Sequence, residues 1–150
     1  MDPVDGTRAD HGAEAKAAAG VQLVLELVAR VPGFEGVYEC HLFNEHEVLD
    51  HVFFWDVVQE TVRSYLGEGE ADGPDWREVL AFLEEETRRA VPGALEVIGT
   101  SFLYKLPYEG QPGYGIEAHL GPAMRQLYLE IRPWYGAQAA VPAKVPNPQG

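Results

Sequence analysis

The sequence predicts an all-α protein that folds as a single compact domain. Apolar residues recur at three- and four-residue intervals, and no segment shows the clean apolar–polar alternation of a half-buried strand. The 150 residues, 46% of them hydrophobic, suit one domain with a sizeable core. We therefore expect five to six helices within residues 13–136, a flexible arm at residues 1–12 and an extended, proline-rich tail at residues 137–150.

Three helices are expected in the first half of the chain. Residues 13–31 carry an apolar stripe at helical spacing, and Pro32-Gly33 ends it. A short helix at residues 34–42 and a long one at residues 45–66 follow, and the broad apolar surface of the long helix predicts that it is central. The core is expected to form around five aromatic residues: Phe53, Trp55, Trp76, Phe82 and Phe102.

In the second half, a polar loop precedes Asp75, which predicts the N-cap of a helix, with Glu78 in the capping-box position. Another helix is expected near residues 94–106, followed by a glycine- and proline-rich loop. The last helical region, near residues 116–131, contains Gly121-Pro122. Because proline is tolerated in the first turn of a helix and disruptive deeper in, we expect a kink or a restart at Pro122.

The net charge of −13 lies almost entirely in residues 35–86, which hold fifteen acidic residues against two basic ones, Arg63 and Arg77. Such a charge repels phosphate backbones, so nucleic acid is not an expected partner. The same field attracts a basic protein and increases its rate of association.

Other features exclude further classes of protein. The single cysteine, Cys40, excludes an internal disulfide framework and a multi-cysteine zinc site. No apolar run approaches the length of a membrane span, and the N-terminus lacks the basic-then-apolar layout of a signal peptide. We expect a cytoplasmic protein with no membrane partner and no cofactor.

A histidine cluster offers one alternative function, a small metal-binding protein or metal-dependent enzyme that uses His46, Asp50 and His51, with His119 brought in by folding. The segment 46–51 resembles the metalloprotease helix motif but contains one residue too many, so the two histidines would point about 140° apart around a helix. His46 and Asp50 do have the i, i+4 spacing of a weak site. The favoured interpretation is a solvated histidine paired with Asp50 or Glu47.

Other patterns that could carry catalysis also have structural explanations. Adjacent side chains on a helix point about 100° apart, so Cys40 and His41 are poorly placed as nucleophile and base. Residues 84–86 are three glutamates followed by two arginines, which is typical of a solvated face with i, i+4 ion pairs. The hydroxyls of Thr100 and Ser101 are expected to bond the carbonyl one turn back. We therefore expect no catalytic residues.

Four short motifs occur in order along residues 79–123: Phe82-Leu83-Glu84-Glu85-Glu86, Ser101-Phe102-Leu103, Leu106-Pro107 and Leu120-Gly121-Pro122. Together with the upstream aromatic segment 51–56, this order resembles a family of small acidic bacterial domains of unknown function, over roughly residues 22–131. Many proteins of that kind are suspected immunity proteins, or partners of secreted toxins. The resemblance implies such a role for this chain and supplies no catalytic residues.

The leading hypothesis is a non-catalytic domain, of immunity or regulatory type, that docks a basic protein through residues 35–86. Acidic residues would steer association, and aromatic residues would anchor the contact. The expected partner-binding residues are Glu68, Glu70, Asp72, Asp75, Trp76, Glu84, Glu85, Tyr108 and Tyr114. A further alternative is a helical bundle that binds a small ligand in a pocket lined by Phe53, Trp55, Phe102 and Tyr104.

Overall fold

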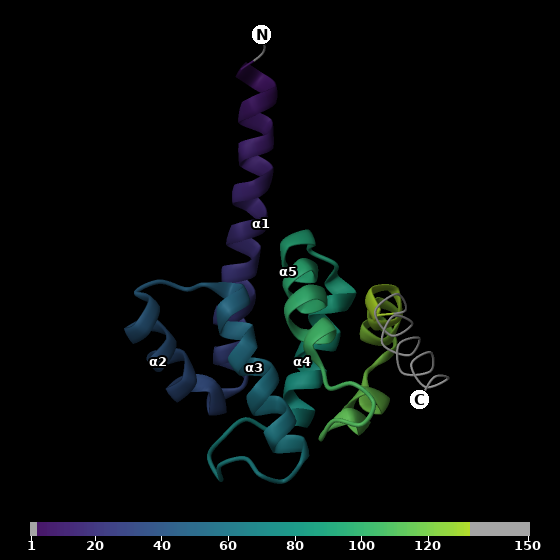
Figure 1. Cartoon of the computed structure of the whole chain (residues 1–150). Coiled ribbons are helices and arrows are strands. Elements are labelled where there is room, and N and C mark those ends of the chain that lie inside the picture. Colours follow the sequence, from purple (N-terminus) through teal and green to yellow (C-terminus); the bar gives the residue numbers. More distant parts are fainter. Residues whose placement is uncertain (1–2, 133–150) are drawn as a thin grey trace, which may run out of the picture.

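The computed structural model describes residues 3–132, with side chains from residue 12 onward, and over that range it is helical with no strand (Figure 1). The all-α prediction is confirmed. The tail expected at residues 137–150 lies outside the described residues. The α-helices are α1 (Pro3–Arg30), α2 (Glu35–Glu45), α3 (Asp50–Tyr65), α4 (Trp76–Arg89) and α5 (Pro92–Val97), and a further helix occupies residues 122–132.

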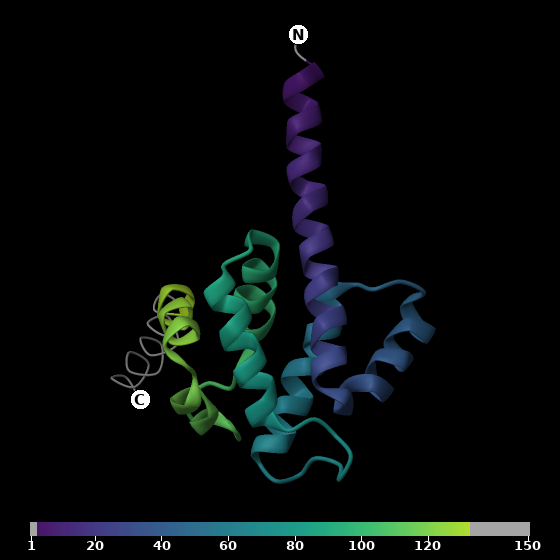
Figure 2. The ribbon, with the colours of Figure 1, turned by 180° about the vertical axis from the view of Figure 1, so that it is seen from behind.

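Helix α1 is longer than predicted, because it begins at Pro3 and the backbone of residues 3–12 continues it. Its C-terminal half packs on the body through the buried side chains of Leu23, Val24 and Leu27. Its N-terminal half projects beyond the other helices, as the opposite views in Figures 1 and 2 show. The expected arm is therefore helical from Pro3, in keeping with proline at a helix start and the alanine-rich sequence after it.

Helix α3 is central, as predicted, and contacts α1, α2, α4 and α5. The rings of Phe53 and Phe54 are fully buried, and Phe54 meets Phe102 edge to face at 6.4 Å. Trp55 was expected in this core, but it is 53% exposed. The next residue on a helix points about 100° away, which turns Trp55 out of the core beside the buried Phe54.

The predicted helix at residues 45–66 is interrupted at its start. His46 takes a left-handed conformation (φ 66°), and its N–H bonds the carbonyl of Leu42, which ends α2. Helix α3 begins at Asp50, so His46 and Asp50 lie on different elements and lose the i, i+4 relation of the predicted metal pair. Many helices end with one residue in the left-handed backbone conformation, and that residue is usually glycine.

Helix α4 follows its prediction closely. The side chain of Asp75 accepts the N–H of Arg77 at 3.2 Å, which confirms the N-cap. The inner face is buried as expected and consists of Trp76, Val79, Leu80, Leu83 and Thr87.

The helix expected near residues 94–106 is present with an uneven pitch. Helix α5 passes directly into a π-helical segment, η2 (Ile98–Phe102), and a 3-10 turn, η3 (Leu103–Lys105). After a loop and the 3-10 helix η4 (Tyr114–His119), the chain restarts as a helix at Pro122, which confirms the predicted restart. That last helix lies close to η2, since a Cβ on Gly99 would stand 2.6 Å from the Ile131 side chain.

Glu84 connects α4 to this last helix, so the predicted solvated face at residues 84–86 is wrong in part. The Glu84 carboxylate is buried and accepts the N–H groups of Ala123 and Met124 at 2.9 and 3.0 Å, at the open N-terminus of helix 122–132. Glu86 is also buried and pairs with Arg89 at 3.1 Å, while the exposed Glu85 pairs with Arg88 at 3.5 Å. Both pairs have i, i+3 spacing instead of the expected i, i+4.

Among the described helices, none is by itself both long and apolar enough to cross a membrane. The stretch Gly12–Arg30 meets that criterion only together with Pro32–Glu45, and the two are bent by 111°.

Candidate functional site

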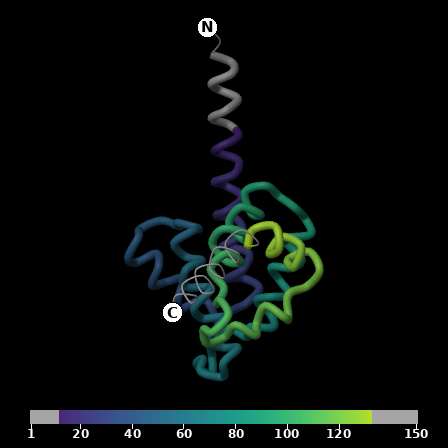
Figure 3. Tube along the Cα trace, turned by 45° about the vertical axis from the view of Figure 1, so that its right-hand side comes forward, coloured from purple at the N-terminus to yellow at the C-terminus, as the bar shows by residue number. Residues whose placement is uncertain are grey.

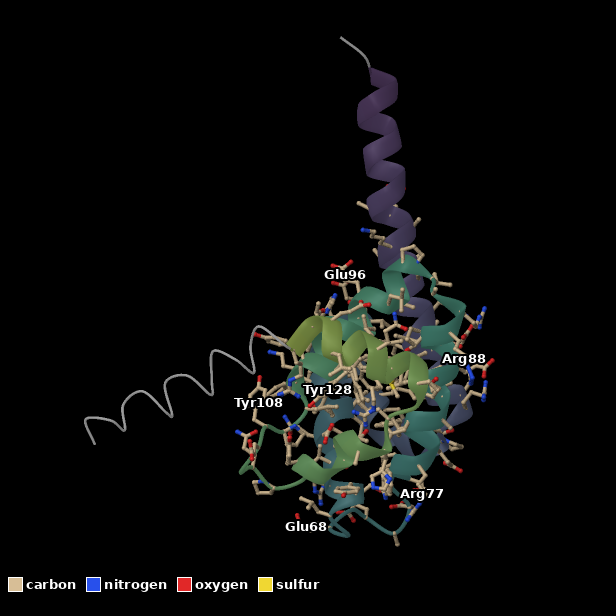
Figure 4. All side chains as sticks on the ribbon, turned by 90° about the vertical axis from the view of Figure 1, so that its right-hand side faces the viewer. Glu68, Arg77, Arg88, Glu96, Tyr108 and Tyr128 are labelled. Carbon is tan, nitrogen blue, oxygen red and sulfur yellow. The ribbon has the colours of Figure 1, made fainter. Side chains whose placement is uncertain are left out.

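The loop at residues 66–75 joins α3 to α4 and holds four of the predicted partner-binding carboxylates. Glu68, Glu70, Asp72 and Asp75 are all exposed, and Figure 4 shows Glu68 and Arg77 at the same end of the molecule. Two of the four have a cation nearby, because Arg63 lies 4.0 Å from Glu70 and Arg77 lies 3.7 Å from Asp75.

The outer face of α2 is a second acidic surface, which the site prediction did not include. Glu35, Glu39 and Glu45, followed by Glu47, are exposed on a helix at the edge of the body (Figures 1 and 3). No ion pair involves these four carboxylates in the part of the chain that the structure describes. The signal was in the sequence, since no lysine or arginine occurs between Arg30 and Arg63.

The two acidic surfaces adjoin at Gly33. A Cβ at this position would lie 2.4 Å from the backbone of both Gly73 and Pro74, so the turn before α2 sits directly against the loop. Only glycine allows such an approach without displacing one backbone from the other. We call the combined surface the acidic face; it comprises Glu35, Glu39, Glu45, Glu47, Glu68, Glu70, Asp72 and Asp75.

The predicted aromatic anchors are mostly engaged within the fold. Trp76 is only 9% exposed, because its ring packs edge-on against Tyr65 and His119 at 5.0 and 4.9 Å and the Arg77 guanidinium covers it at 4.5 Å. A ring held in this way has little surface to offer a partner.

The two predicted tyrosines differ in their surroundings. The ring of Tyr108 stacks on the buried guanidinium of Arg132 at 4.1 Å, and its hydroxyl donates to the Tyr104 carbonyl at 3.3 Å. Tyr114, which begins η4, is 37% exposed. Tyr114 is therefore the predicted aromatic anchor that presents surface to a partner.

Three large apolar side chains on α2 and α3 are exposed to solvent. Phe43, near the end of α2, is 79% exposed, and Val52 and Trp55 on α3 are 46% and 53% exposed. Sequence reasoning missed them because Trp55 was assigned to the core and Phe43 falls just past the predicted end of its helix. Exposed apolar groups beside charged ones are typical of protein-binding surfaces.

A groove of about 380 Å³ runs between α2 and α3, close to these apolar residues. Its lining combines apolar, acidic and nucleophilic side chains: Gly36, Val37, Cys40, His41, Asn44, Glu45, Val52 and Asp56. Burial raises the pKa of the Asp56 carboxyl above its ordinary value, and the neighbouring His41 opposes that shift. The groove thus holds a carboxylate that has lost part of its hydration.

His41 supports this groove from inside the fold. Its ring is 4% exposed and packs edge-on against Phe53 at 5.4 Å. Its Nε2 accepts the N–H of Leu49, the N-cap residue of α3, at 3.0 Å. An accepting Nε2 carries no proton, so the ring proton is on Nδ1. Cys40, by contrast, is exposed, and its Sγ is 3.7 Å from the Asn44 amide.

The remaining histidine candidates do not form a metal site. Among the described residues, no group of three or more histidine, cysteine, aspartate or glutamate side chains is placed to hold a metal ion. His51 instead hydrogen bonds through Nδ1 to the hydroxyl of Ser101, which links the first turn of α3 to the π-helical segment. The bond expected to the carbonyl one turn back is confirmed for Thr100, which donates to Glu96 at 2.7 Å, whereas the Ser101 hydroxyl meets His51.

The pocket expected for a small ligand is not formed by the four residues predicted to line it. Phe53 and Phe102 are fully buried, and Phe54 makes edge contacts with both, at 6.5 and 6.4 Å, so ring atoms fill that space. Trp55 lies outside the core, where the Lys105 ammonium is 5.8 Å from its ring.

Some of the predicted site residues are exposed carboxylates, and others pack within the fold. The groove between α2 and α3 was not predicted from the sequence. The groove between α2 and α3 combines carboxylates, partly exposed valines and an imidazole, which can make ionic, apolar and hydrogen-bonded contacts. The chain matches no protein-family model, no curated protein and no solved structure.

Proposed function

We propose that this chain is a non-catalytic binding domain that docks a basic protein through its acidic face. The observation that carries the proposal is the distribution of ion pairs. The carboxylates of α2 have no lysine or arginine within ion-pair distance among the described residues, although they lie on one short helix. A basic partner would supply the missing positive charge.

Several carboxylates elsewhere on the molecule are neutralised from within. Arginines pair with Glu60 at 3.3 Å, with Glu85 at 3.5 Å and with Glu117 at 3.4 Å. Exposed pairs of this kind contribute little to stability, but they do reduce the local potential. The carboxylates of α2 have no such pairs among the described residues, so their negative field is not reduced in this way and would steer a basic protein toward α2.

A specific version of this function is suggested by the resemblance to small acidic bacterial domains. In that version the chain is a cytoplasmic immunity protein that blocks a basic toxin, such as a nuclease, by covering its positively charged substrate surface. The net charge of −13 and the exposed ring of Phe43 on α2 support this version.

The test compares two variants of equal net charge as baits in a lysate of the source cell. One replaces Glu35, Glu39, Glu45 and Glu47 with glutamine. The matched control replaces four exposed glutamates outside the acidic face: Glu78, Glu96, Glu109 and Glu130.

We expect the wild type and the control to retain the same basic protein at low salt and to lose it at high salt, and we expect the α2 variant not to retain it. Equal retention by both variants would contradict the role of α2. The recovery of no basic protein at low salt would contradict the function itself.

A further inference from the structure

We infer that the groove between α2 and α3 receives an apolar side chain from a basic segment of the partner, while lysines or arginines on that segment pair with carboxylates on the two walls. This inference rests on the proposed function and specifies where on the molecule the partner is anchored. The occupant is a short basic segment with at least one large apolar residue between its cations.

The apolar part of the groove is open to such a side chain. Val37 of α2 and Val52 of α3 face each other across the groove, and both retain exposed surface. Phe43 follows Cys40, which lines the groove, by three residues on α2, and its ring is 79% exposed. An apolar side chain placed there would cover surface that is now in contact with water, which favours association.

The walls of the groove are acidic on both sides. Glu45 comes from α2 and Asp56 from α3, and in the described part of the chain neither has an ion-pair partner. Asp56 is half-buried, so water already solvates its charge poorly. A cation brought into the groove would therefore gain more from Asp56 than from a fully hydrated carboxylate.

His41 adds a hydrogen-bond donor at the groove. Its Nε2 accepts the Leu49 N–H, so the ring proton is on Nδ1. The ring is almost completely buried and also lines the groove. A backbone carbonyl of the docked segment is the natural acceptor for this proton, and such bonds fix the register of a bound peptide.

A second groove differs in the sign of its charge. It has a volume of about 430 Å³ and lies between α3 and the loop after η3, with Trp55, Val62, Leu66 and Pro107 in its lining. Its charged residues are Arg63 and Lys105, which would repel a basic segment. Charge complementarity therefore selects the groove between α2 and α3 for this occupant.

The experiment uses amide chemical shifts of the full chain titrated with synthetic peptides of about 15 residues. One peptide carries lysines with leucines at helical spacing, the second has serine in place of leucine, and the third has glutamate in place of lysine. We expect the lysine–leucine peptide to bind most tightly and to shift the amides of α2 and of residues 50–57. The glutamate peptide is expected not to bind.

Variants then separate the contributions to binding. We expect V52S and D56N each to weaken the lysine–leucine peptide by about three- to tenfold. Glu96→Gln, which removes an exposed carboxylate outside the groove, is the control and is expected to leave the affinity unchanged. Each variant is first checked for an unchanged amide spectrum away from the substitution, so that a folding defect is not taken for a binding defect.

The possible failures are distinguishable. Shifts confined to residues 66–75 and 114–119 would overturn the groove while leaving the proposed function in place. Equal affinity for the leucine and serine peptides would overturn the apolar anchor. Shifts of the groove amides on simple dilution would identify a second copy of this chain as the occupant and overturn the inference. No binding of any lysine peptide at low salt would count against the proposed function as well.

Discussion

Helices α2 and α4 are both rich in glutamate, yet their carboxylates have different tasks. On α4, Glu84 caps another helix, and Glu85 and Glu86 pair with arginines one turn away. On α2, the carboxylates have no such partners in the described part of the chain. The comparison shows that one acidic stretch of sequence holds both charges that serve the fold and charges that no cation neutralises among the described residues.

The largest expected effect comes from Glu84. Replacing it with alanine removes the acceptor of two N–H groups at the start of helix 122–132, one buried and one partly buried, and opens a void beside Gly121. Because hydrogen bonds to a charged group are stronger than neutral ones, we expect a loss of about 2–4 kcal/mol in the free energy of unfolding. Urea unfolding followed by circular dichroism measures it.

The control for Glu84→Ala is Glu85→Ala, the neighbouring residue on the exposed side of the same helix. This change removes one exposed ion pair, so we expect it to cost less than about 0.5 kcal/mol. Equal losses for the two variants would show that Glu84 does not carry the contact between α4 and the last helix.

A smaller loss of stability is expected on substitution of Gly33, where the turn before α2 meets the loop at residues 66–75. In Gly33→Ala, the new methyl group would overlap the backbone of Gly73 and Pro74, so we expect a loss of about 1–3 kcal/mol. Gly36, three residues later within α2, has open space around its Cβ position. Because alanine favours the helix more than glycine does, Gly36→Ala is expected to stabilise the protein by roughly 0.5–1 kcal/mol.

Thermal unfolding of the two alanine variants measures this contrast. A stable Gly33→Ala protein with unchanged amide shifts at residues 66–75 would contradict the close contact between the turn before α2 and the loop.

Asp56 is expected to show a pH-dependent effect. Burial raises its pKa in the folded state above the ordinary value of 3.8, so the folded protein holds that proton more tightly than the unfolded chain does. The contribution of Asp56 to stability is therefore complete below the ordinary pKa and is lost as the pH rises through the folded-state pKa. We expect D56N, which has no charge to desolvate, to melt slightly above the wild type at pH 7.

Melting temperatures measured from pH 7 down to pH 3 test this sign. The difference between D56N and the wild type is expected to shrink as the pH falls and to vanish below the ordinary pKa. A variant that is less stable than the wild type at neutral pH would show that Asp56 supports the fold. The expected combination, higher stability and weaker peptide binding, is typical of a residue kept for recognition.

The sequence predicted most elements of the fold because local rules govern them. Helical spacing of apolar residues located the helices, Asp75 marked a helix start, and Pro122 marked a restart. The boundary between α2 and α3 was expected between residues 42 and 45 but lies at residues 46–49, because His46, and not glycine, takes the left-handed conformation that ends α2. Nothing in the local pattern of residues 45–50 distinguishes that ending from a continuous helix.

The candidate site was harder to predict, for physical reasons that differ between residues. The partners of Glu84 lie 39 and 40 residues away, so only the packed structure shows that this carboxylate is buried. Trp55 was assigned to the core because its side chain is large and aromatic. Its exposure depends instead on which side of α3 the other helices cover, which only the packed structure shows. The charge of α2 was visible in the sequence, whereas the groove beside it depends on how two helices pack.

The glutamine variant of the α2 carboxylates is expected to lose partner binding but to change little in stability. The variant with glutamine at Glu35, Glu39, Glu45 and Glu47 removes a like-charge pair at i, i+4 spacing and an acidic residue from the last turn of α2, both slightly unfavourable. It also removes an acidic residue from the first turn, which is slightly favourable. The net change is expected to stay below about 1 kcal/mol.

The dependence of the melting temperature on salt concentration tests this expectation further. If the charges of α2 repel one another, added salt screens them and raises the melting temperature of the wild type, with a smaller rise for the glutamine variant. The control variant with glutamine at Glu78, Glu96, Glu109 and Glu130 is expected to respond to salt as the wild type does. A large loss of stability in the α2 variant would mean that these carboxylates are needed by the fold, and the distinction between α2 and α4 would not hold.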